Sequence, residues 1–181
     1  MFKYLALGDS YTIGELLPYK ENFPSQLVDL LQKDGLPVTL EKLIAVTGWT
    51  SDELLKAIEI ERPTFDYDIV SLLIGVNNQY RNFPTQDYRW QFYALLCQAI
   101  LFAKSIPKNV FVLSIPDWGL TPFNVDRDPK VITTEIDALN AINRDITIAM
   151  GCTYIPITEF TRQHANQMRY LASDGLHYSA S

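Results

Sequence analysis

The sequence predicts an α/β fold, a three-layer α/β/α sandwich around a five-stranded parallel sheet. Five short apolar runs of strand length recur along the 181 residues, and longer segments with helical spacing lie between them. Strands that alternate with helices form βαβ units, whose crossover helices cover both faces of a parallel sheet. For five such strands we expect the flavodoxin-like order 2-1-3-4-5.

The first half of the chain contains three of the expected strands and two of the expected helices. The strands cover residues 2–7, 38–46 and 67–74, which are apolar or β-branched. A helix over residues 25–33 carries leucines on one face and is followed by Gly35, a typical stop signal. A helix over residues 50–60 opens with the capping box TSDE and ends before Pro63.

The second half of the chain continues the alternation. Helices are expected over residues 86–105 and 133–150, and strands over residues 109–115 and 152–157. Residues 116–130, PDWGLTPFNVDRDPK, form the one long irregular stretch. A connection this long inside a compact domain is usually functional or disordered, and its Trp118 and Phe123 favour an ordered loop.

Composition limits the classes of function. The length suits one domain over residues 1–181, and the net charge of −6 argues against a nucleic-acid partner. No apolar run reaches the ~20 residues of a membrane span, and the first apolar run is a strand rather than a signal peptide, so we expect a cytoplasmic protein. Cys97 and Cys152 lack metal or redox spacing, which favours buried small hydrophobic residues and no metal site.

Ser10, in the stretch GDSY, raises the question of chemistry. It follows the first expected strand, at the sheet edge where doubly wound folds bind ligands. A serine becomes a nucleophile when a base takes its proton, and histidine is the natural base near neutral pH. Of the two histidines, His164 lies in a polar, helix-like segment and is expected on the solvated surface. His177 follows Asp174 by three residues in DGLH, so the carboxylate can fold back to the imidazole and orient it.

Two further positions offer donors for the negative charge on an attacked carbonyl oxygen. Gly48 lies in the turn after the second strand, and Asn77 follows the third. Either one alone is compatible with an ordinary turn. Together with Ser10, Asp174 and His177 they all fall after strands, and independent turns would seldom supply a nucleophile, donors and a base at one edge.

The blocks GDSY, the glycine after strand two, GVNN and DGLH resemble the GDSL, or SGNH, hydrolase family of esterases and lipases over nearly the whole chain. The resemblance implies ester hydrolysis on an α/β/α sandwich, without a metal or cofactor. It implies Ser10 as nucleophile, Asp174 and His177 as the rest of the triad, and the Ser10 amide, Gly48 and Asn77 as the oxyanion hole.

Three departures from the family pattern stand out. Tyr11 replaces the leucine of the family's name, at a position expected to pack. Asn78 stands where the third block more often has an acidic residue. The family usually continues into a terminal helix after the DGLH block, so we expect the domain over residues 1–181 to lack that helix.

The substrate is less well defined by the sequence. Five aromatic residues lie on loops expected to ring the site: Tyr11, Trp49, Tyr80, Trp118 and Phe123. A short-chain acyl ester, an acetylated sugar and a lysophospholipid all remain possible as the small-molecule partner. Arg81 and Arg89 could meet an anionic head group, but solvated surface charge is the simpler interpretation of both.

Two other classes of function are compatible with parts of the sequence. A non-catalytic binding module with a doubly wound sheet explains the fold but leaves the coincidence of site residues unexplained. A nucleotide-binding domain would need a glycine-rich phosphate loop after the first strand, and GDSYTIG has neither common form of it.

Overall fold

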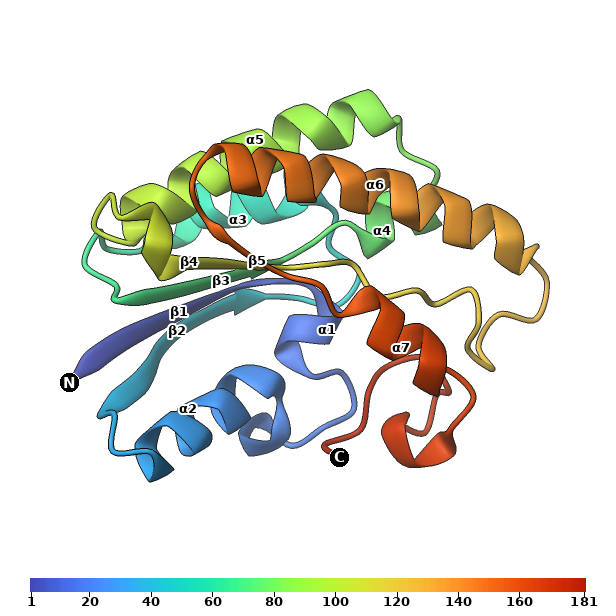
Figure 1. The fold of residues 1–181 in the computed structure, drawn as a ribbon, viewed down its shortest axis with the longest axis horizontal. Helices are drawn as coiled ribbons and strands as arrows, with labels where there is room; N and C mark the ends of the chain where they lie inside the picture. Colours follow the sequence, from blue (N-terminus) through green and yellow to red (C-terminus); the bar gives the residue numbers. More distant parts are fainter.

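Five parallel strands form the central sheet, and their order is β2-β1-β3-β4-β5, which confirms the predicted topology (Figure 1). The computed structural model describes all residues from 1 to 181. The strands are β1 Phe2–Gly8, β2 Val38–Ala45, β3 Ile69–Leu73, β4 Val110–Leu113 and β5 Thr153–Ile155. Because β1 pairs with both β2 and β3, it is an interior strand, and its carboxyl end lies at the switch point where neighbouring crossovers leave on opposite faces of the sheet.

Helices cover the sheet from both sides (Figure 1). On one side lie α3 Ser51–Glu61, α4 Val76–Tyr80, α5 Thr85–Phe102 and α6 Pro129–Ala149, and on the other lie α1 Ser10–Ile13, α2 Phe23–Lys33 and α7 Thr158–His164. Three short 3-10 turns, Tyr19–Glu21, Pro107–Asn109 and Met168–Tyr170, complete the set. The predicted three-layer sandwich is therefore confirmed.

The alternation of side chains along β1 divides the core in two. Leu5 and Leu7 belong to a cluster of 28 buried residues that includes the inner faces of α3, α5 and α6. Tyr4 and Ala6 point the other way and join a cluster of only 4 buried residues, with Val28 of α2. Since hydrophobic stabilisation scales with buried apolar area, the layer of α3, α5 and α6 contributes most of it.

Several predicted boundaries were wrong for identifiable reasons. α6 begins at Pro129 rather than at residue 133, because Asp128 caps it by accepting the Lys130 N–H at 2.9 Å. α5 ends at Phe102, and Lys104 and Ser105 after it have positive φ angles of 58° and 59°. Cys97 and Cys152 are free and only half-buried, so the expectation of full burial was also wrong.

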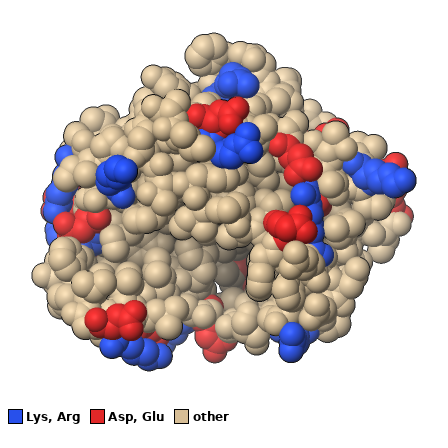
Figure 2. All heavy atoms as spheres, viewed as in Figure 1, with Lys and Arg blue, Asp and Glu red and all other residues tan.

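Two one-turn helices were not predicted, and both carry site residues. α1 follows β1 after a single residue, and α4 follows β3 after two. The surface of the molecule shows acidic and basic side chains interspersed on the face in Figure 2, with a hollow in its lower half. None of the helices combines the length and apolar character that crossing a bilayer requires.

Candidate active site

Ser10 is the first residue of α1, at the carboxyl end of β1. Asp9 takes an extended conformation between the two elements, and its Oδ1 accepts the Tyr11 N–H at 3.1 Å. This capping bond lets the helix start at once, without a loop. Ser10 is consequently held on a short, buried connection at the carboxyl end of an interior strand.

Asp174 and His177 interact within one tight turn. Asp174 Oδ2 lies 2.6 Å from His177 Nδ1, and Asp174 Oδ1 accepts the N–H groups of Leu176 at 2.9 Å and His177 at 3.0 Å. Burial raises the pKa of Asp174, but these hydrogen bonds, led by the one from the His177 ring, outweigh it and hold the pKa below its usual value. The carboxylate therefore stays ionised at neutral pH and fixes the orientation of the ring.

Ser10 and His177 face the same space. Both line two cavities, of about 190 Å³ and about 300 Å³, and Tyr11 is the only other residue that lines both. Ser10 Oγ and the His177 ring form no hydrogen bond here, and such catalytic bonds often tighten only when substrate is bound. The structure thus brings together the serine, the histidine and the carboxylate that the sequence singled out.

The smaller cavity contains both predicted oxyanion donors, Gly48 and Asn77. Gly48 has a φ angle of +84°, a conformation natural to glycine, and its N–H donates to no acceptor in the protein. Asn77 Nδ2 donates one hydrogen bond to the Trp49 carbonyl at 3.0 Å. Because an amide nitrogen carries two hydrogens, Asn77 keeps one donor for a ligand.

α4 can carry Asn77 only because of the glycine before it. Gly75 has a φ angle of +130°, and a Cβ there would lie 2.7 Å from both Ile115 and the Tyr88 ring. No larger residue fits this close approach. The strand β3 can therefore turn directly into α4 and place Asn77 beside the loop after β2.

Asn78 has a different task from Asn77. It is buried, its Oδ1 accepts the Ser51 N–H at 3.0 Å, and its Nδ2 donates to Ser51 Oγ at 2.7 Å. These bonds satisfy the first turn of α3. At the position where the family more often has an acidic residue, the Asn78 amide therefore uses its oxygen and its nitrogen to bind Ser51.

Four of the five predicted aromatic residues reach the site. Tyr80, Trp118 and Phe123 line the smaller cavity, with ring centroids 5.3 to 6.5 Å apart, and the Trp118 indole N–H donates to Gln79. Tyr11 is buried, and its ring lies 5.1 Å from that of His177, so it does pack as expected. Trp49 lines neither cavity; it packs partly buried against the core.

An ion pair missed in the sequence anchors the loop that carries Trp118 and Phe123. Asp117 is fully buried; its Oδ1 accepts the Gly119 N–H at 2.9 Å, and its Oδ2 accepts from Thr133 at 2.7 Å and from Arg162 at 3.0 Å. An Asp two residues before a glycine is a signal for an Asx turn and could have been noticed. Its partner Arg162 lies 45 residues away, and no sequence pattern connects the two residues.

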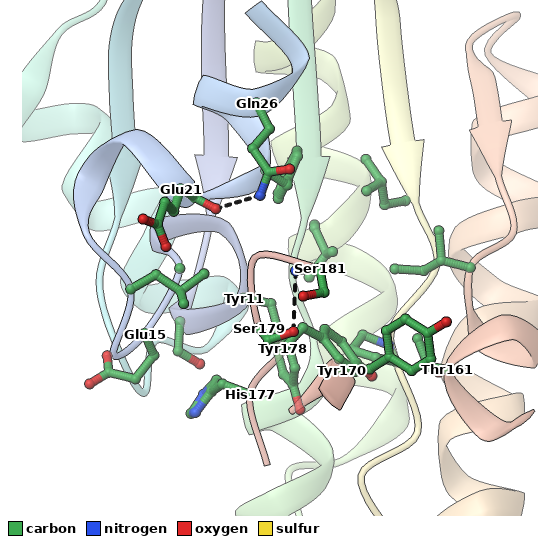
Figure 3. Close-up of a pocket in the computed structure, with 18 of the residues that line it drawn as sticks. Tyr11, Glu15, Glu21, Gln26, Thr161, Tyr170, His177, Tyr178, Ser179 and Ser181 are labelled. Carbon is green, nitrogen blue, oxygen red and sulfur yellow. Dashed lines mark hydrogen bonds between the residues drawn. The ribbon is translucent and has the colours of Figure 1, made fainter. Parts of the chain in front are cut away.

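The larger cavity lies under the sheet, between α1 and α2 on one side and α7 with the C-terminal segment on the other (Figure 3). Leu73, Leu113 and Ile157 give it apolar walls. His164 lines it too, half-buried beside the Phe160 and Tyr170 rings, with Nδ1 bonded to the Phe160 carbonyl at 2.8 Å. His164 is therefore partly buried in the cavity wall, and not fully solvated as the sequence suggested.

A buried carboxyl group lies directly beside the serine. Burial raises the pKa of Asp9 to about 7, although the Tyr11 N–H opposes the shift. Its Oδ2 has no hydrogen-bond partner, nor do the Tyr11 hydroxyl and the Thr12 hydroxyl. No three of the His, Cys, Asp and Glu side chains come together in a way that could hold a metal ion.

Comparison with solved structures finds the same fold in esterases. The esterase EstA from Pseudoalteromonas sp. matches with a TM-score of 0.73 and 17% identity, over 99% of this chain and 89% of that one. A lipase/acylhydrolase from Enterococcus faecalis matches with a TM-score of 0.66 and 24% identity, over 99% and 88%. The acetyl xylan esterase Axe2-W215I from Geobacillus stearothermophilus matches with a TM-score of 0.68 and 18% identity, over 99% and 88%.

Comparison with curated protein sequences finds no match. The model of the GDSL-like Lipase/Acylhydrolase family, in contrast, matches residues 6–181, which include every residue of the site described above. The chain therefore belongs to the GDSL-like lipase/acylhydrolase family of ester-bond hydrolases.

Proposed function

We propose that the protein is a serine esterase that forms an acyl-enzyme on Ser10. The observation that supports this most directly is the 2.6 Å hydrogen bond between Asp174 and the ring of His177, at a cavity lined by Ser10, Gly48 and Asn77. A histidine oriented in this way keeps Nε2 free to take the serine proton. The remaining residues then have distinct roles in acyl transfer.

In the first half-reaction, His177 Nε2 accepts the proton of Ser10 Oγ while that oxygen attacks the ester carbonyl carbon. The carbonyl π electrons move onto oxygen, and the main-chain N–H groups of Ser10 and Gly48 and the Asn77 amide stabilise the charge. The tetrahedral intermediate then expels the alcohol oxygen, which takes the proton from His177. The products are a free alcohol and an acyl ester of Ser10.

In the second half-reaction, a water molecule replaces the alcohol. His177 Nε2 accepts a proton from the water as its oxygen attacks the acyl carbon, and the same donors stabilise the oxyanion. Collapse breaks the bond to Ser10 Oγ, which recovers its proton from His177 and releases the carboxylic acid. Asp174 stays ionised throughout and stabilises the imidazolium form.

The smaller cavity favours a short acyl group. Its volume is about 190 Å³, and the rings of Tyr80, Trp118 and Phe123 form part of its wall. A carbohydrate O-deacetylase is the second candidate, because Tyr80 and Phe123 are each 39% exposed at the rim and could stack on a sugar. Both candidates would hydrolyse an acetyl ester. They differ in the alcohol part of the substrate, which is a sugar for the deacetylase and an apolar alcohol for the short-chain esterase.

The test is turnover of 4-nitrophenyl acetate and of acetylated xylose by the wild-type protein and by Ser10→Ala. We expect the variant to lose both turnover and labelling by a fluorophosphonate, with an unchanged melting temperature. Ser173→Ala is the matched control, since this exposed serine precedes Asp174 and lines neither cavity. Turnover by Ser10→Ala close to the wild-type rate would reject the proposal, and binding of substrate without turnover by the wild type would favour a non-catalytic module.

A further inference from the structure

Asn77 of α4 and Arg81, the residue that follows α4, hold consecutive carbonyl groups of the loop after β2. Arg81 Nη2 donates to the Gly48 carbonyl at 2.6 Å, and Asn77 Nδ2 donates to the Trp49 carbonyl at 3.0 Å. Asn77 and Arg81 are four residues apart, so they project from the same face of the helix end. The segment that carries the Asn77 donor thus binds the loop that carries the Gly48 donor.

These hydrogen bonds matter because Gly48 itself is conformationally free. Glycine reaches both signs of φ at little cost, so a peptide group beside it can rotate readily. Gly48 is only half-buried, and its own N–H makes no bond within the protein that would fix it. Fixing the Gly48 carbonyl restricts ψ of this residue, which anchors the position of its nitrogen relative to the cavity and leaves φ as the remaining freedom of its N–H.

Arg81 is itself held before any substrate arrives. Its Nη1 lies 3.3 Å from Glu53 Oε2, and the same oxygen accepts the Thr50 N–H at 2.9 Å in the capping box of α3. The guanidinium therefore bridges the start of α3 and the Gly48 loop. A planar fork with several fixed donors suits this double contact better than a single ammonium group does.

We infer that Arg81 is a positioning residue of the oxyanion hole, which holds the Gly48 amide in the orientation that stabilises the transition state. The inference rests on the proposed function and assigns a role there to Arg81, which is exposed as the sequence predicted. Donors that are fixed in advance stabilise developing charge without reorganisation during the reaction. Arg81 supplies that fixation through the backbone and does not itself touch the substrate.

The experiment compares Arg81→Gln, Arg81→Lys and Arg89→Gln with the wild type, using 4-nitrophenyl acetate and a short alkyl boronic acid. Arg89 is the matched control because it is an exposed arginine on α5 that lines neither cavity. For Arg81→Gln we expect kcat per titrated site to fall about tenfold with KM nearly unchanged, less than the 10²–10³-fold loss of a whole donor. The inhibition constant for the boronic acid, whose tetrahedral adduct on Ser10 mimics the intermediate, should rise by a similar factor.

Arg81→Lys keeps a cation near Glu53 but cannot contact Glu53 and the Gly48 carbonyl together, so its kcat should lie between those of Arg81→Gln and the wild type. This second variant also shows whether the loss in Arg81→Gln comes from a folding defect. A merely structural ion pair would instead lower the melting temperature while kcat and the boronic acid constant stay within twofold of wild type in both Arg81 variants. That result would overturn the inference. If the wild type shows no turnover that depends on Ser10, the proposed function fails first, and the role of Arg81 fails with it.

Discussion

His177 Nδ1 lies 2.6 Å from Asp174 Oδ2, while Asp174 Oδ1 accepts the main-chain N–H of the same histidine at 3.0 Å. One carboxylate thus fixes both the backbone and the ring of its partner. Since only two residues separate them, this part of the site forms within a single turn and needs little help from distant packing. The His177 carbonyl, which accepts the Ala172 N–H at 2.7 Å, closes the turn on itself.

The two histidines should respond differently to replacement. His177→Ala should lower kcat by several orders of magnitude, because loss of the base of a serine hydrolase is that costly. His164→Ala should keep kcat within a few-fold, because its Nδ1 bonds to the Phe160 carbonyl and no carboxylate orients it. Steady-state kinetics with 4-nitrophenyl acetate measures both. Comparable losses in the two variants would contradict the assignment of the base.

The buried ion pair between Asp117 and Arg162 should matter for stability. Arg162→Ala leaves the fully buried Asp117 without its cation, and breaking such a pair costs about 3 kcal/mol of unfolding free energy. Arg144→Ala is the matched control, because Arg144 and Asp145 form an exposed pair worth about 0–1 kcal/mol. Urea unfolding followed by tryptophan fluorescence gives both values. Equal losses of unfolding free energy in the two variants would show that the buried pair stabilises the fold no more than the exposed pair does.

The sequence predicted those parts of the fold and site that depend on local pattern or on general rules of parallel sheets. Apolar runs and helical spacing indicated the strands and their order, and Ser10, Gly48 and Asn77 could be placed together because the carboxyl ends of parallel strands meet at one edge. Asp174 and His177 could be paired because they are three residues apart.

Contacts between distant segments could not be predicted. Arg81 reaches the Gly48 carbonyl across 33 residues, and Arg162 reaches Asp117 across 45, with no periodicity that connects either pair. α1 and α4 span 4 and 5 residues, too short for a hydrophobic period to be seen. The partial burial of His164 depends on the path of α7, which composition alone does not reveal.

Asn77 should affect both turnover and stability, because the structure gives its amide a hydrogen bond to Trp49 besides the proposed role. Asn77→Ala should lower kcat by roughly 10²–10³, about 2.7–4 kcal/mol, with KM nearly unchanged. Asn78→Ala is the control, since the Asn78 side chain hydrogen-bonds only to Ser51, and its loss should lower the melting temperature while kcat stays within a few-fold. Rates are normalised by active-site titration. Normal kcat in Asn77→Ala, with a lower melting temperature, would remove Asn77 from the oxyanion hole.

Asp9 should make the stability of the protein depend on pH. Burial raises its pKa in the folded state from 3.8 to about 7. Between these values the folded state binds more protons than the unfolded state, so the contribution of Asp9 to stability is complete below about pH 4 and is lost as the pH rises toward about 7. Asp9→Asn keeps an oxygen that can accept the Tyr11 N–H but does not titrate. The unfolding free energy of the variant minus that of wild type should therefore increase from pH 4 to pH 7 and then level off, as measured by urea unfolding at several pH values. A difference that stays constant over this range would show that Asp9 titrates at its ordinary pKa despite its burial.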